Sequence, residues 1–150
     1  MVDRNARDNL AKRLRQLASG AVTNFAFEKR AVNSKDKAVH EIEWVLAWPT
    51  YDDFHEHRLE GKWKLPATAR REFARAVVFL KTDLPYRWPR QSVILWVWRG
   101  LKNLMSSPPR SSRDMTIESG DSSVWPFWSV SDFRDSLKNP PYLRGKRNLT

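Results

Sequence analysis

The chain has 150 residues, of which 41% are hydrophobic and 29% charged, a composition typical of a folded domain and not of a disordered chain. It contains no cysteine, which excludes disulfides, thiolate metal sites and cysteine nucleophiles. The net charge is +10 and is spread along the sequence without a basic run, so long-range attraction favours an acidic protein or a nucleic acid as partner. We predict a single, mainly α-helical domain of about five to six helices over residues 1–150.

The first fifty residues predict three helices. Over residues 6–18, apolar side chains recur on one face, and Gly20 follows as a stop signal. Four basic side chains lie off that face: Arg7, Lys12, Arg13 and Arg15. The face that carries Arg13 and Arg15 could contact phosphate, but we expect it to be solvated. Thr23 is placed to cap a short second helix over residues 24–30.

The third helix is predicted to begin near Ser34 or Asp36. Its inward stripe consists of Ala38, Ile42, Val45 and Leu46. Trp44 and Trp48 form a second apolar stripe, so we expect this helix to be buried on two sides. The helix should end or kink at Trp48, because the next residue is Pro49.

Residues 51–57 hold the densest cluster of reactive side chains. If the segment is helical, Asp53 and His57 are four residues apart and face the same way, as a metal-binding pair would. His40, the only histidine outside this segment, lies before the Pro49 break, so a third ligand is not evident. Solvated polar residues at a helix end account for the cluster more simply, and we expect no metal and no cofactor.

Two further segments follow. Pro66 suits the first position of a helix over Ala67–Lys81, which carries an apolar stripe. Residues 91–105 fit either a helix or, at 92–98, a short buried strand; the length favours the helix. Residues 106–123 lack periodicity and are dominated by small polar residues, chiefly serine, so they predict a long mobile loop.

The C-terminal part, residues 124–150, combines aromatic and basic side chains. Ser131 is placed to cap a short helix over Asp132–Leu137. The residues with interface chemistry are Trp125, Phe127, Trp128, Arg134, Tyr142 and Arg144. They are the candidate binding residues, but docking of this segment onto the helical part at residues 3–105 accounts for the same rings more simply.

Neither end of the chain nor its apolar runs indicate a membrane protein. The most apolar run, Val93 to Trp98, has six residues, whereas a membrane-spanning helix needs roughly 20. The charged first 15 residues lack the apolar stretch of a signal peptide. We therefore expect no membrane span and a cytoplasmic location.

Several stretches taken together resemble a group of small bacterial proteins with no established activity. They are residues 15–20, Tyr51-Asp52-Asp53 with Glu56-His57-Arg58-Leu59, Phe79 to Asp83 running to Tyr86-Arg87-Trp88-Pro89, Trp125-Pro126-Phe127, and Pro141-Tyr142-Leu143. The resemblance implies a bacterial cytosolic protein whose C-terminal segment belongs to the same domain as the helices.

No phosphate-binding loop, nucleophile elbow or nucleic-acid-binding motif is present. We therefore predict a non-enzymatic protein-binding or accessory module, of the immunity or antitoxin kind, that meets an acidic protein through a basic, aromatic-rich surface. The first alternative is a nucleic-acid-binding protein that acts through its charge. The second is a metal-dependent enzyme built on Asp53 and His57.

Overall fold

The computed structural model describes residues 1–88 and 120–138. Its helices are α1 (Arg4–Ala18), α2 (Asn24–Glu28), α3 (Lys37–Ala47), α4 (Ala67–Leu80) and α6 (Val130–Lys138), with short 3-10 turns at Trp48–Thr50, Gly61–Trp63 and Ser122–Val124. These five helices, with no strand among the described residues, confirm the mainly α-helical prediction.

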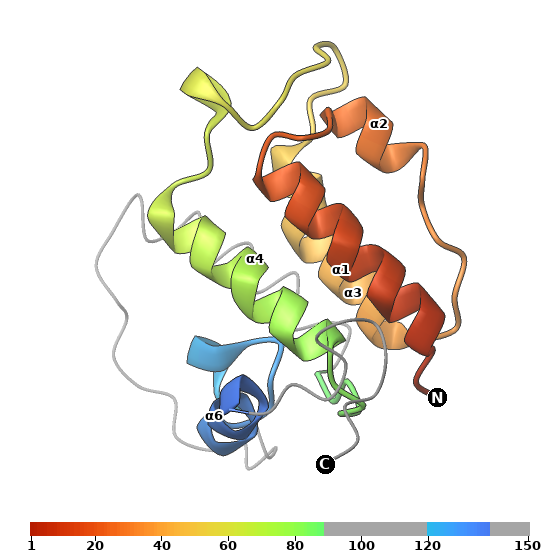
Figure 1. Ribbon diagram of the computed structural model, residues 1–150, viewed down its shortest axis with the longest axis vertical. Helices are drawn as coiled ribbons and strands as arrows, with labels where there is room; N and C mark the ends of the chain where they lie inside the picture. The colour runs from red at the N-terminus through yellow and green to blue at the C-terminus, as the bar shows by residue number, and fades with distance from the viewer. Residues whose placement is uncertain (89–119, 139–150) are drawn as a thin grey trace, which may run out of the picture.

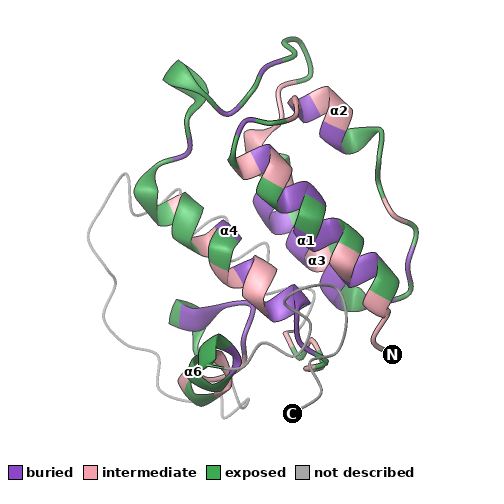
Figure 2. Cartoon of the chain, in the orientation of Figure 1, coloured by how far each residue is buried: buried purple, intermediate pink, exposed green. Residues whose placement is uncertain are grey.

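Helices α1, α3 and α4 form the central packing unit (Figure 1). The apolar stripe of α1, with Leu10 and Leu14 fully buried, meets Ile42 of α3 and Leu80 of α4 in one hydrophobic cluster. Figure 2 shows that buried residues concentrate on α1 and α3, whereas the connection from α3 to α4 is mostly exposed. The core therefore lies between long helices, and the short α2 sits beside it.

The predicted helix boundaries follow from local chemistry. The side chain of Thr23 accepts a hydrogen bond from the backbone N–H of Ala26 at 3.1 Å and caps α2. Asp36 caps α3 in the same way. Gly20 has a φ of 72°, which favours glycine, and a Cβ there would lie only 2.6 Å from the Glu60 carboxylate.

A buried ion pair joins α1, α3 and the end of α4. Arg7 is fully buried, and its Nε lies 2.7 Å from Oδ2 of Asp36. Its Nη1 donates to the carbonyls of Thr82 and Leu84, each at 2.9 Å. The sequence pattern places Arg7 off the apolar face of α1, but its side chain is buried because the guanidinium supplies the donors that these three segments need in the core.

Residues 120–138 pack against α4. Phe127 is fully buried and meets the Phe79 ring edge-to-face, with centroids 5.1 Å apart. Arg75 of α4 donates from Nε to the Trp125 carbonyl at 2.6 Å, and Trp88 donates from its indole to the Pro126 carbonyl at 3.1 Å. Polar contacts and aromatic packing therefore both hold residues 120–138 against α4 and the residues that follow it.

Helix α6 differs from the prediction at its start. It begins at Val130, and the Ser129 hydroxyl, not that of Ser131, accepts from the backbone N–H of Asp132 at 3.1 Å. The predicted Ser131 cap is wrong because the helix starts two residues earlier than its first acidic residue indicates.

Some predictions fall on residues 89–119 and 139–150. The helix or strand at 91–105 and most of the loop at 106–123 therefore lie outside the described residues. Inside that loop range, Ser122–Val124 forms a 3-10 turn capped by Asp121. Over residues 1–88 and 120–138, no helix has the combination of length and apolarity that crossing a bilayer requires.

Candidate functional site

The segment 51–57 is a turn and not a helix. Oδ1 of Asp52 accepts from the backbone N–H of Phe54 at 2.8 Å and from that of His55 at 3.2 Å. The hydrogen bond from Phe54 is the main reason that the pKa of Asp52 lies below its ordinary value. The prediction that Asp53 and His57 face the same way is therefore wrong, because it assumed a helix. The Asp52 side chain instead accepts from the backbone donors of a turn.

Asn24 fastens this turn to α2. Its Nδ2 donates to the His55 carbonyl at 3.1 Å, and its Oδ1 accepts from the His57 backbone N–H at 2.9 Å. His57 is buried with its ring stacked on Trp63 at 4.1 Å, whereas Asp53 is exposed. No group of three or more His, Cys, Asp or Glu side chains within residues 1–88 and 120–138 could hold a metal ion.

The predicted C-terminal binding residues are distributed between core and surface. Trp125 and Phe127 are 5% and 0% exposed, so their rings are core residues and present no accessible face. Trp128 is half-buried, and Arg134 is exposed on α6. The other two predicted binding residues, Tyr142 and Arg144, lie outside the described residues.

Exposed aromatic rings gather instead along α3 and the turn that follows it. Trp44 and Trp48 are 52% and 56% exposed, and their rings stack with centroids 4.5 Å apart. Trp48 stacks in turn with Tyr51 at 6.1 Å, and Tyr51 meets Phe25 of α2 at 5.9 Å. We call these four side chains the aromatic row. The prediction that α3 is buried on two sides is wrong, because its tryptophan face is open.

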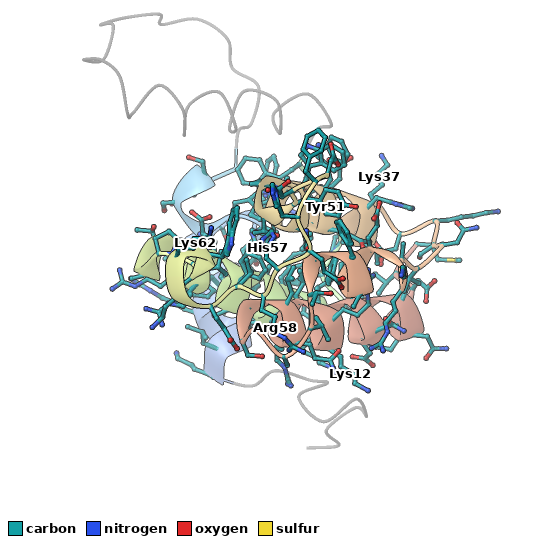
Figure 3. All side chains as sticks on the ribbon, turned by 90° about the horizontal axis from the view of Figure 1, so that it is seen from above. Lys12, Lys37, Tyr51, His57, Arg58 and Lys62 are labelled. Atoms are coloured by element: carbon teal, nitrogen blue, oxygen red, sulfur yellow. The ribbon has the colours of Figure 1, made fainter. Side chains whose placement is uncertain are left out.

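A pocket of about 250 Å³ lies between α2 and α3 and is bordered by three members of the aromatic row, Trp44, Trp48 and Tyr51. We call it the α2–α3 pocket. Apolar side chains that line it include Leu17, Phe27, Ala31 and Ala47. Figure 3 shows Tyr51 on the side of the chain where Lys37 lies, away from Lys12. The pocket is therefore an apolar hollow with rings at its border.

Two carboxylates also line the α2–α3 pocket, whereas no lysine or arginine does. The Glu43 carboxylate lies 2.8 Å from Nη2 of Arg13. Arg13 is buried, so the prediction that its side chain is solvated is wrong. Glu28 accepts from the Tyr51 hydroxyl at 2.5 Å and forms no ion pair with any described residue. Of the two carboxylates, Glu28 is therefore the one without an ion-pair partner among the described residues, and its side chain is exposed.

The hydrogen bond to Glu28 raises the pKa of Tyr51 from an ordinary 10 to about 12. Because this folded-state pKa lies above the unfolded one, the contribution of Tyr51 to stability is present below about pH 10 and is lost as the pH rises toward 12. We expect Glu28→Ala to lower the pKa of Tyr51 toward 10. Titration of the tyrosinate absorbance against pH measures this pKa. The Tyr51→Phe variant identifies the part of the absorbance that belongs to Tyr51. An unchanged titration in Glu28→Ala would contradict the assignment.

Exposed basic side chains are not gathered on one face. In Figure 3, Lys37, Lys62 and Lys12 lie on three different sides, with Arg58 on the same side as Lys12. A phosphate backbone requires basic groups arranged along one surface. The positive charge of the described residues is thus a general property of the surface.

Comparisons of this chain with protein-family models, with curated proteins and with solved structures give no match.

Proposed function

We propose that this chain is a non-enzymatic binding protein that docks a partner protein on the aromatic row and the α2–α3 pocket. One observation carries the proposal: two tryptophans, Trp44 and Trp48, are more than half exposed and border a pocket. Exposed apolar patches of this kind mark interaction sites, and tryptophan is the side chain most enriched among residues that dominate binding energy.

The surroundings of the pocket support an acidic partner. Lys29 and Arg30 directly follow α2, next to Glu28 and Ala31 of the pocket lining, and both side chains are exposed. An apolar centre with a charged rim is the usual anatomy of a protein interface. The net charge of +10 adds long-range attraction for an acidic protein, and an accessory or neutralising role of the immunity or antitoxin kind needs no more than such binding.

Substitution of Trp48 tests the proposal. The tagged chain is incubated with lysate of its source cells, with and without nuclease, and captured proteins are identified and quantified by mass spectrometry. We expect Trp48→Ser to lose a partner that the unsubstituted chain retains, with affinity for the purified partner reduced by at least about 30-fold, as removal of a dominant interface residue implies. Because Trp48 is more than half exposed, its loss should leave the fold intact.

The matched control is Phe54→Ser. Phe54 is 88% exposed and does not line the pocket, so this variant should bind the partner as the unsubstituted chain does. Equal capture by Trp48→Ser and the unsubstituted chain would refute the proposal. So would recovery of nucleic acid alone that disappears with nuclease or moderate salt, or a Trp48-dependent dimer of the chain itself in sedimentation.

A further inference from the structure

We infer that the partner anchors itself in the α2–α3 pocket through a basic side chain, lysine or arginine. This inference rests on the proposed function and specifies the chemistry that the pocket takes. The indole rings of Trp44 and Trp48 and the carboxylate of Glu28 lie at one site. Aromatic faces attract a cation through their quadrupole, and tryptophan is the strongest of them.

The charge at the pocket opposes that of the whole chain. The chain carries +10, yet the pocket lining holds two carboxylates and no lysine or arginine. Arg13 pairs with Glu43, whereas the Glu28 carboxylate accepts from the uncharged Tyr51 hydroxyl and forms no ion pair with a described residue. A cationic side chain would therefore meet a carboxylate that no described basic side chain pairs, and an acidic one would be repelled.

The size of the pocket favours a single side chain. Its volume of about 250 Å³ is below the roughly 300–1,000 Å³ of pockets that enclose drug-sized ligands. The lining is apolar toward Leu17 and Phe27, which suits the methylene stem of a lysine or arginine, while the charged head reaches Glu28. A second copy of this chain is disfavoured as the occupant because two chains of +10 repel each other.

Blocked tripeptides of sequence Gly-X-Gly test the inference, with X as lysine, arginine, norleucine or glutamate. Norleucine retains the carbon chain of lysine and lacks the ammonium group. Binding is followed by the indole N–H resonances of Trp44 and Trp48, assigned with Trp→Phe variants. We expect the lysine or arginine peptide to shift both resonances saturably and to bind about fivefold more tightly than norleucine, as a partly solvated cation–π contact implies. The glutamate peptide should not bind.

Glu28→Gln isolates the role of the charge, because the amide oxygen still accepts from the Tyr51 hydroxyl. We expect this variant to weaken the preference for lysine over norleucine, because only the indole rings then attract the ammonium group. Glu60→Gln is the matched control, since Glu60 is exposed and does not line the pocket; it should keep the preference.

Equal binding of lysine and norleucine peptides, or no resonance shift with any peptide, would overturn the inference. Neither peptide result would affect Trp48-dependent capture of the partner. The proposed function would then stand, and only the inference about a basic anchor would fall. Conversely, partner capture that does not depend on Trp48 would refute the proposed function. Charge-selective peptide binding would in that case still establish which side chain the pocket prefers.

Discussion

Arg7→Leu should destabilise the chain by about 3–5 kcal/mol, the cost of removing one partner from a buried ion pair. The substitution leaves the Asp36 carboxylate, which is 4% exposed, without its guanidinium partner. It also removes the Arg7 donor from the Leu84 carbonyl and from the Thr82 carbonyl, which keeps a hydrogen bond from Arg4. Both effects place unpaired polar groups in the core. Urea unfolding followed by circular dichroism measures the change.

The loss should depend on pH. Burial alone would raise the pKa of Asp36, but hydrogen bonds from Arg7 and from the Asp3 backbone outweigh burial and hold the pKa below its ordinary 3.8. In the unsubstituted chain, Asp36 therefore adds stability above about pH 4 that is lost as the pH falls through its folded pKa. Without Arg7, burial favours the protonated acid. The stability difference between the two proteins should thus narrow below about pH 4.

Arg15→Leu is the control for this experiment. Arg15 lies on the same helix, α1, but is exposed, so its replacement should change stability by no more than about 0.5 kcal/mol. A similar loss from both substitutions, or a loss in Arg7→Leu that is constant with pH, would mean that the Arg7–Asp36 pair does not stabilise the fold as described.

Phe127→Ala should also cost about 3–5 kcal/mol, the range for large-to-small substitution of a buried aromatic residue. The Phe127 ring is fully buried, meets Phe79 of α4 edge-to-face, and lies 5.2 Å from the Phe133 ring of α6. Its removal leaves a cavity where α4 and α6 meet. Urea unfolding gives the loss, and hydrogen exchange should show α6 amides losing protection before those of α1.

The control is Phe54→Ala, which removes an equally large ring that is 88% exposed and should change stability by less than about 0.5 kcal/mol. A cost below about 1 kcal/mol for Phe127→Ala would contradict the packing of residues 120–138 as part of the core, since even small cavities exceed it.

Helix boundaries were predictable because they depend on neighbouring residues. Thr23, Asp36 and Gly20 act through their own hydroxyl, carboxylate or backbone conformation, and these can be inferred locally. The same local reasoning chose the wrong cap for α6. Ser129, two residues before Ser131, has the same hydroxyl group and is the residue that caps the helix.

The candidate site was not predictable in this way. The spacing of Trp44 and Trp48 shows that α3 has a second apolar face, but only the tertiary structure shows that this face stays open. Arg7 gave no sequence signal of its burial, because its partners come from residues 36, 82 and 84. Asn24 likewise acts on residues that lie about thirty positions later in the chain.

Asn24 has a consequence for how this chain could evolve new specificity. Helix α2 has only five residues, too few to persist on its own, and Asn24 ties it to the turn that carries Tyr51. One wall of the α2–α3 pocket is thus a short helix that joins the core through Phe27 and the turn through Asn24, while its other side chains lie at the surface. The exposed residues of α2 can therefore vary without disturbing the packing of α1, α3 and α4. The chemistry of the pocket is free to change while those three helices stay the same.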